Sequence, residues 1–138
     1  MLSLSTLSSQ RVLRAVCWLD ALTGLLLGAL HLALASPLSD WLGLPAGLLQ
    51  AAGLALLGYA ALAISVARAP HMPKGLLWAL VLGNWAWVAG CLVLLLGTGA
   101  QPTAWGQAYL WVHVVAVAAL AELQWMGVRR LPGLAVAA

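Results

Sequence analysis

The chain has 138 residues, of which 64% are hydrophobic and only 7% are charged, and its mean hydropathy is +1.03. This composition excludes an ordinary soluble domain and indicates a protein that lies largely within a membrane. The net charge of +3 comes from Lys and Arg residues that are spread over short pieces of chain and form no basic stripe. We therefore predict the lipid bilayer, with its anionic head groups, as a partner and no nucleic acid.

Four apolar segments follow one another, at about residues 13–35, 47–67, 75–97 and 105–127. Each is long enough to cross the ~30 Å hydrocarbon core as a helix. Because short loops make successive helices antiparallel neighbours, the sequence predicts an all-α fold, an up-down-up-down bundle of four transmembrane helices. The whole chain, residues 1–138, forms a single transmembrane domain in this prediction, and closure of the bundle places its first and fourth helices side by side.

The first loop, residues 36–46, carries helix signals of its own. We expect Ser39 or Asp40 to cap one short turn, and Trp41 to lay that turn on the outer membrane surface. Pro45 suits the first turn of the second spanning helix.

The basic residues are confined to one side of the predicted membrane. They are Arg11 and Arg14 before the first segment, Arg68 and Lys74 between the second and third, and Arg129 and Arg130 after the fourth. The other two loops, 36–46 and 98–104, contain neither Lys nor Arg. Since cytoplasmic loops are rich in these residues, we predict that both termini are cytoplasmic.

Small residues of the first segment indicate close helix packing. Gly24 and Gly28 form a GxxxG motif, which allows two helix backbones to approach. Such motifs also mediate dimerisation, but packing within the bundle is the favoured interpretation in a chain this rich in Gly, Ala and Leu. Cys17 and Cys91 fall near opposite faces of the membrane, so we predict no disulfide between them.

Polar residues inside the spans form the main candidate site, because such residues are costly in hydrocarbon. The candidates, one from each helix, are Asp20, Tyr59, Asn84 and Glu122. A rise of about 1.5 Å per residue places all of them roughly 8–14 Å from the cytoplasmic ends. We interpret them as a ligand-binding or proton-carrying site, in which two carboxylates share a proton or bind a small cation or amine. In the structural alternative, the carboxylates pair with Lys or Arg at the helix ends while Asn84 and Tyr59 bridge helices.

His31 and His113 are further candidates in the outer half of the membrane, at roughly 20–25 Å by the same rise. They suggest either haem ligation between two helices or two unrelated histidines. On the fourth helix His113 and Glu122 lie on opposite faces, so they cannot both point at the bundle axis. Residues that share the face of His113 are Ala116, Leu120 and Gln124.

No established catalytic motif occurs in the chain: HExxH, GxSxG, P-loop and Rossmann patterns are all absent from the sequence. We therefore predict no catalytic residues, no metal site, no cofactor and no enzymatic activity.

Several short motifs carry a family resemblance. They are Leu19-Asp20-Ala21 with Gly24, Leu42-Gly43-Leu44-Pro45, Gly58-Tyr59-Ala60, Gly83-Asn84-Trp85-Ala86-Trp87, and Ala121-Glu122-Leu123-Gln124 with Gly127. Over nearly the whole chain the sequence resembles an uncharacterised group of small bacterial four-helix integral membrane proteins. This resemblance implies the bacterial inner membrane and transfers no activity.

The leading functional hypothesis is a non-enzymatic membrane module that binds a small ligand or a lipid, or an accessory subunit of a membrane complex. The alternative is a small proton-coupled transporter or exporter that acts as an oligomer through its intramembrane carboxylates. A haem-binding redox protein is the third hypothesis. A second copy of the chain or another membrane protein is the expected protein partner.

Overall fold

The structure is a computed structural model that describes residues 4–97 and 99–131. The helices of this part are α1 (Leu4–Ala33), α2 (Ala35–Leu42), α3 (Ala46–Arg68), α4 (Lys74–Leu96) and α5 (Ala104–Arg130). All except the short α2 are long and apolar enough to cross a membrane, which gives four candidate spans. The predicted fold class, an all-α bundle of four spanning helices, is confirmed.

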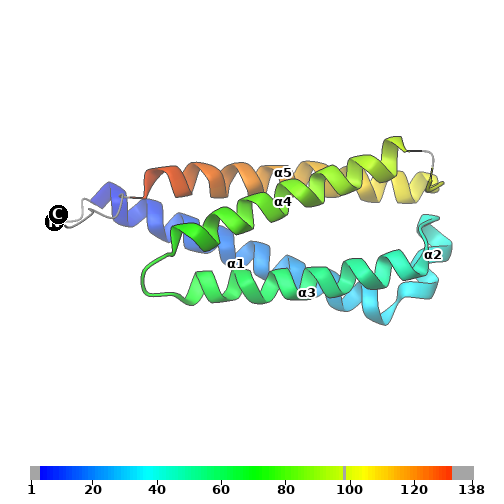
Figure 1. The fold of residues 1–138 in the computed structure, drawn as a ribbon, viewed down its shortest axis with the longest axis horizontal. Helices are drawn as coiled ribbons and strands as arrows, with labels where there is room; N and C mark the ends of the chain where they lie inside the picture. Colours follow the sequence, from blue (N-terminus) through cyan, green and yellow to red (C-terminus); the bar gives the residue numbers. More distant parts are fainter. Residues whose placement is uncertain (1–3, 98, 132–138) are drawn as a thin grey trace.

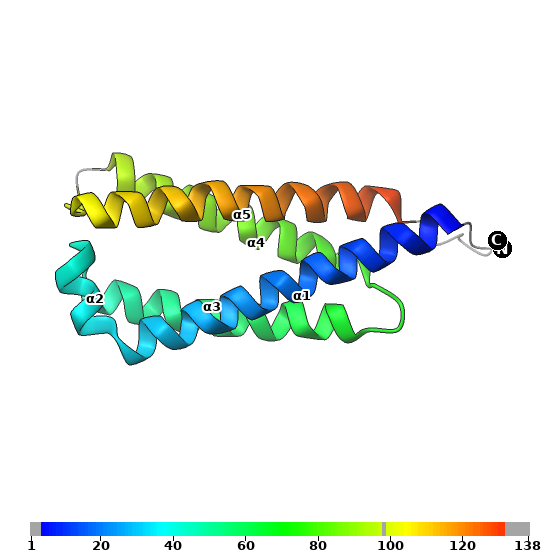
Figure 2. The same ribbon diagram turned by 180° about the vertical axis from the view of Figure 1, so that it is seen from behind.

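The long helices associate as two pairs, α1 with α3 and α4 with α5 (Figure 1). The contact between α3 and α4 is much smaller, although these helices follow one another in the chain. The first and last long helices, α1 and α5, also pack together, as expected. Seen from both sides, the two pairs converge toward the end where α1 begins and α5 ends (Figure 2).

Glycines bring α1 and α3 into backbone contact. A Cβ atom on Gly28 would lie 3.0 Å from the carbonyl oxygen of Gly53, and one on Gly53 would lie 3.0 Å from that of Gly28. Gly24 faces the same partner helix, where its Cβ would meet the Cβ of Ala60 at 3.6 Å. The GxxxG motif therefore packs within the bundle, as the favoured interpretation held.

A full short helix, α2, replaces the single turn expected in the first loop. The chain bends at Leu34 (φ −122°, ψ 29°) and resumes helical geometry at once at Ala35. Ser39 and Asp40 consequently lie inside α2, and the expectation that one of them caps its start is wrong. Because the helix starts directly after α1, no free N-terminus remains for a cap. Gly43 ends α2 in the left-handed region, with φ 68°, which glycine adopts without strain.

The end of α2 is fastened to the start of α5. The backbone N–H of Thr103 donates to the carbonyl oxygen of Leu42 at 3.0 Å, and its hydroxyl donates to that of Trp41 at 2.7 Å. The same hydroxyl accepts from Gly106 N at 3.1 Å and so caps α5. A Cβ on Gly106 would lie 2.0 Å from the Leu42 oxygen, so only glycine permits this contact.

The opposite end of the bundle collects the basic residues, because α1 and α4 begin there and α3 and α5 end there. Arg14 donates from Nη1 to the carbonyl oxygens of Ala67 and Ala69, at the C-terminus of α3. A cation is favourable at that position because the last carbonyl groups of a helix lack backbone partners. The cytoplasmic orientation of this end stays a prediction.

The outward faces of the long helices are apolar. Leu26 on α1, Leu54 on α3, Leu82 on α4 and Val115 on α5 are exposed to 70%, 63%, 64% and 68%. Such a surface suits contact with lipid tails. Cys17 and Cys91 are buried in separate apolar clusters as free thiols.

Candidate functional site

One carboxylate oxygen joins all four spanning helices. Oδ2 of Asp20 on α1 accepts hydrogen bonds from the Tyr59 hydroxyl on α3 at 2.7 Å, from Asn84 Nδ2 on α4 at 3.0 Å and from Gln124 Nε2 on α5 at 2.5 Å. Asn84 Nδ2 also donates to Gln124 Oε1 at 3.1 Å. We call these four residues the Asp20 cluster.

The Asp20 cluster is buried and closely fitted. Asp20 and Asn84 are each 4% exposed, and Gln124 is fully buried. Gly83 makes room for the Tyr59 ring, since a Cβ there would lie 2.9 Å from a ring carbon. The cluster thus cross-links the helix pairs α1/α3 and α4/α5, and hydrogen bonds of this kind hold membrane helices together.

Glu122 does not belong to this cluster, and the expectation that it would is wrong. Its side chain is half-buried, and it makes no hydrogen bond or ion pair with any described residue. Residues two positions apart on a helix are rotated by about 200° about the helix axis. Glu122 and Gln124 therefore cannot face the same partner. Gln124 lies on the same inward face of α5 as His113. This shared face was the feature of the sequence that could have predicted Gln124 as a member of the cluster.

No cation compensates Asp20 within residues 4–97 and 99–131. Neither Asp20 nor Glu122 forms an ion pair there, so the alternative pairing with Lys74, Arg129 or Arg130 is not observed. Oδ1 of Asp20 accepts no hydrogen bond from the same residues. Asp20 therefore has one saturated oxygen and one oxygen without a partner.

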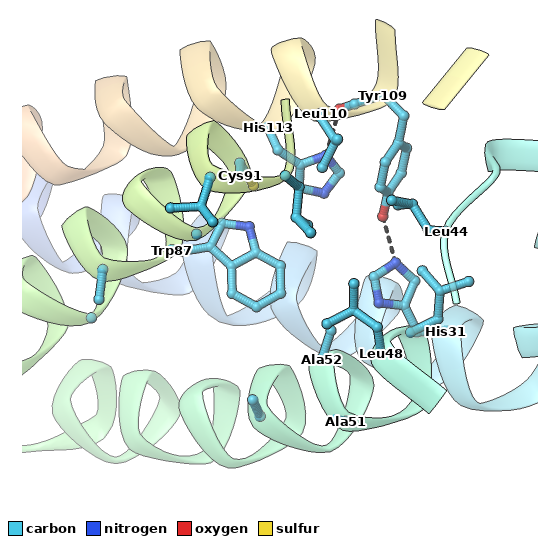
Figure 3. Close-up of a pocket in the computed structure, with 17 residues that line it drawn as sticks. His31, Leu44, Leu48, Ala51, Ala52, Trp87, Cys91, Tyr109, Leu110 and His113 are labelled. Carbon is cyan, nitrogen blue, oxygen red and sulfur yellow. Dashed lines mark hydrogen bonds between the residues drawn. The ribbon is translucent and has the colours of Figure 1, made fainter. Parts of the chain in front are cut away.

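A cavity of about 560 Å³ lies nearer the α2 end, between α3 and α4 (Figure 3). Much of its wall on these two helices consists of the small residues Ala51, Ala52, Ala55, Gly83, Ala86 and Gly90. Ala51 on α3 and Ala86 on α4 are also exposed on the outside of the bundle, so this large cavity opens between the two helices. Its volume lies in the range of pockets that hold drug-sized molecules, roughly 300–1,000 Å³.

Four aromatic residues with polar atoms also line the large cavity: His31 from α1, Trp87 from α4, and Tyr109 and His113 from α5. Nε2 of His31 hydrogen-bonds the Tyr109 hydroxyl at 2.5 Å, and Nδ1 of His113 donates to the Tyr109 carbonyl oxygen at 2.9 Å. The ring centroids of Trp87 and His113 are 6.4 Å apart. We call these four residues the cavity cluster.

Three nitrogen atoms of the cavity cluster are buried without a hydrogen-bond partner. They are Nδ1 of His31, Nε1 of Trp87 and Nε2 of His113, and no other side-chain nitrogen or oxygen in the described part of the chain shares this condition. His31 and His113 are only 2% and 7% exposed. Each unpartnered buried group costs about 1–3 kcal/mol, and all three nitrogens belong to side chains that line the large cavity.

The two histidines do line one cavity, as haem ligation would require. However, Nε2 of His31 is already bonded to Tyr109, and ligation of one iron by both Nε2 atoms would break that bond. Among the described residues, no three or more His, Cys, Asp or Glu side chains gather into a metal site.

A smaller cavity of about 180 Å³ connects the two polar clusters. Asp20, Tyr59 and Asn84 line it, and it shares Trp87 and His113 with the large cavity. Polar side chains thus follow one another along the interior of the bundle.

Sequence reasoning missed three members of these clusters: Gln124, Tyr109 and Trp87. Tyr109 precedes His113 by four residues and therefore lies on the same helix face, which is a usable signal. Trp87 entered the sequence analysis only as part of the motif Gly83-Asn84-Trp85-Ala86-Trp87.

Comparison with protein-family models, with curated proteins and with solved structures found no match to this chain. The geometry of the two clusters is therefore the basis for the function proposed below.

Proposed function

We propose that this chain is a non-enzymatic integral membrane protein that binds a small lipid-soluble molecule in the large cavity. The observation that carries the proposal is that His31, Trp87 and His113, which hold the three unpartnered nitrogens, all line that cavity. A ligand that supplies hydrogen-bonding groups would remove their desolvation cost. Its apolar body would lie against the Ala and Gly side of the wall.

The ligand enters from the bilayer in this proposal. Support comes from the limited contact between α3 and α4 and from the exposed residues that border the large cavity, including Ala51, Ala86 and Val93. The fastening of α2 to α5 covers the end of the bundle, with Leu44 in the cavity wall. A lateral opening selects molecules that are already dissolved in lipid.

We also propose which membrane holds the protein and how the protein is oriented in it. A bacterial inner membrane with the basic end in the cytoplasm agrees with the collection of Arg14, Arg68, Lys74 and the C-terminal arginines at one end. The α2 end, with the large cavity, would then lie in the outer half of the membrane. Binding of this kind suits a carrier or an accessory subunit that acts with a second copy or a partner protein.

Proton-coupled transport is the second candidate, because Asp20 lines the small cavity with one oxygen unbonded and no cationic partner among the described residues. Proteoliposomes with an internal pH dye would test it. Proton flux through the wild type that Asp20→Asn abolishes supports transport, and equal flux with and without protein contradicts it.

A titration in lipid nanodiscs tests the binding proposal. The protein is labelled with 5-fluorotryptophan, its Trp87 resonance is assigned with Trp87→Phe, and 4-decylphenol is added as a lipid-soluble probe. We expect a saturable shift of the Trp87 resonance, because this indole lines the large cavity.

Gly90→Leu and Gly58→Leu form the matched pair for this titration. A Cβ at either glycine meets no atom within 4 Å, but Gly90 borders the large cavity and Gly58 does not. Gly90→Leu should place its side chain in the cavity and weaken binding at least tenfold, whereas Gly58→Leu should bind as the wild type does. Equal behaviour of both variants, or no saturable shift, contradicts the proposal.

A further inference from the structure

The hydrogen-bonding capacity of the cavity wall narrows the chemistry of the ligand. The indole Nε1–H of Trp87 is a donor and cannot accept. It lies without a partner, on an edge of the ring that faces His113 (Figure 3). A group opposite Trp87 must therefore offer a lone pair.

His113 presents the complementary requirement. Its Nδ1 contacts the carbonyl oxygen of Tyr109 at 2.9 Å, and because a carbonyl only accepts, Nδ1 must carry the hydrogen. A neutral imidazole with its hydrogen on Nδ1 has a lone pair on Nε2. The unpartnered Nε2 of His113 is therefore an acceptor and needs a donor.

We infer that the ligand of the large cavity carries a hydroxyl group, as in an alcohol or a phenol, which accepts from Nε1 of Trp87 and donates to Nε2 of His113. This inference rests on the proposed function. The two rings are neighbours, with centroids 6.4 Å apart, and both side chains line the large cavity. A carbonyl or an ether oxygen satisfies Trp87 alone, and an ammonium group satisfies His113 alone, whereas a hydroxyl satisfies both.

A water molecule has the same pairing, but it does not account for the cavity. One water takes about 30 Å³, a small share of the available space, and the rest of the wall is mostly apolar. An apolar molecule that ends in a hydroxyl matches both the polar pair and the cavity volume of about 560 Å³.

Three probes of the same length separate these requirements: 4-decylphenol donates and accepts, 4-decylanisole only accepts, and decylbenzene does neither. Each is titrated against fluorotryptophan-labelled protein in nanodiscs, with concentrations expressed as mole fraction in the lipid. We expect the phenol to bind about 10- to 100-fold more tightly than the anisole, because a site built for a hydroxyl discriminates against analogues that lack it.

Conservative substitutions test which residues cause the preference for phenol. Trp87→Phe and His113→Phe keep an aromatic ring and remove one polar atom each. His113→Phe should reduce the preference for phenol over anisole to about threefold or less, because no acceptor for the phenol hydrogen remains. Trp87→Phe should instead reduce the preference for anisole over decylbenzene, because both oxygen-containing probes lose the same donor. Binding to Trp87→Phe is followed by the fluorotryptophans that remain and by competition with a brominated 4-decylphenol. The matched controls are Trp85→Phe, on the outer face of the same helix, and His71→Phe, in an exposed loop, and both should retain the preference.

The outcomes separate the hydroxyl inference from the binding proposal. Equal saturable binding of all three probes overturns the hydroxyl inference and leaves the cavity as a site for apolar molecules. Equal binding of phenol and anisole, both tighter than decylbenzene, also overturns it, because His113 would then accept nothing. Absence of saturable binding for every probe overturns the proposed function itself.

Discussion

The Asp20 cluster and the cavity cluster are both made of polar side chains buried in the same apolar bundle, yet only in the first do all the side-chain donors have a partner within the chain. In the Asp20 cluster every hydrogen-bonding nitrogen of Asn84 and Gln124 has a partner, and the Tyr59 hydroxyl reaches both Asp20 and the Leu80 carbonyl oxygen. In the cavity cluster three buried nitrogens have none. We therefore propose different roles for the two clusters, although residues of both line the small cavity.

In a membrane bundle, the partners of a buried polar group distinguish a structural role from a binding role. A group that stabilises helix contacts finds its partners within the chain, because lipid offers none. A group that stays unpartnered beside a cavity is left for something that enters the cavity. Mutations should therefore change stability in the first cluster and binding in the second.

Asp20→Leu should have the largest effect on stability. It removes the acceptor shared by Tyr59, Asn84 and Gln124. Gln124 Nε2 then loses its partner, and Tyr59 and Asn84 keep only the Leu80 carbonyl oxygen and Gln124 Oε1. We expect the free energy of unfolding to fall by roughly 2–4 kcal/mol. Reversible unfolding in mixed micelles titrated with dodecyl sulfate, followed by circular dichroism, measures this. Leu26→Ala, on the lipid-facing side of α1, is the control, and a loss no greater than that of the control would refute the structural role.

Gly83→Ala should have an intermediate effect. The added Cβ would lie 2.9 Å from the Tyr59 ring, so the ring must move and its bond to Asp20 must lengthen. We expect a loss of about 1–2 kcal/mol in the same unfolding assay. Gly58→Ala, where the Cβ meets no atom within 4 Å, should lose nothing by comparison. If the two alanine variants unfold alike, the fit of Tyr59 against α4 is not needed for stability.

His113→Phe should have the smallest effect on stability, and of opposite sign. The phenylalanine ring keeps the shape of the wall and removes a buried nitrogen that has no partner. We expect the free energy of unfolding to stay equal or to rise by up to about 1 kcal/mol in the absence of ligand. A loss comparable to that of Asp20→Leu would place His113 among the structural groups instead.

Much of the fold follows from sequence, because hydropathy and length determine spans almost alone. Asp20, Tyr59 and Asn84 were predicted to lie together because their depths in the membrane are similar. In the structure they are joined by hydrogen bonds. Glu122 was chosen because it is ionisable, and this preference outweighed the helix face. Gln124 lies on the same helix face as His113. Helical periodicity therefore predicts the residue of α5 that joins the Asp20 cluster better than charge does.

The cavity was beyond sequence reasoning for a physical reason. A glycine in a spanning helix serves either close packing or open space, and composition does not distinguish the two. Gly53 touches the backbone of Gly28, whereas Gly90 has no atom within 4 Å of its Cβ position. Only the relative placement of α3 and α4 decides which occurs. The bend at Leu34 that creates α2 does have a sequence signal, Pro37, because proline lacks the N–H that would bond the carbonyl oxygen of Ala33 in a continuous helix.

The central claim is that the unpartnered nitrogens of the cavity cluster belong to a ligand site. The most direct test is an experimental structure of protein extracted from its membrane into nanodiscs without exposure to detergent. Our account predicts density in the cavity between α3 and α4, with a polar atom within hydrogen-bond distance of Trp87 Nε1 and His113 Nε2. A structure in which α3 closes against α4, and protein groups satisfy both nitrogens, would contradict it.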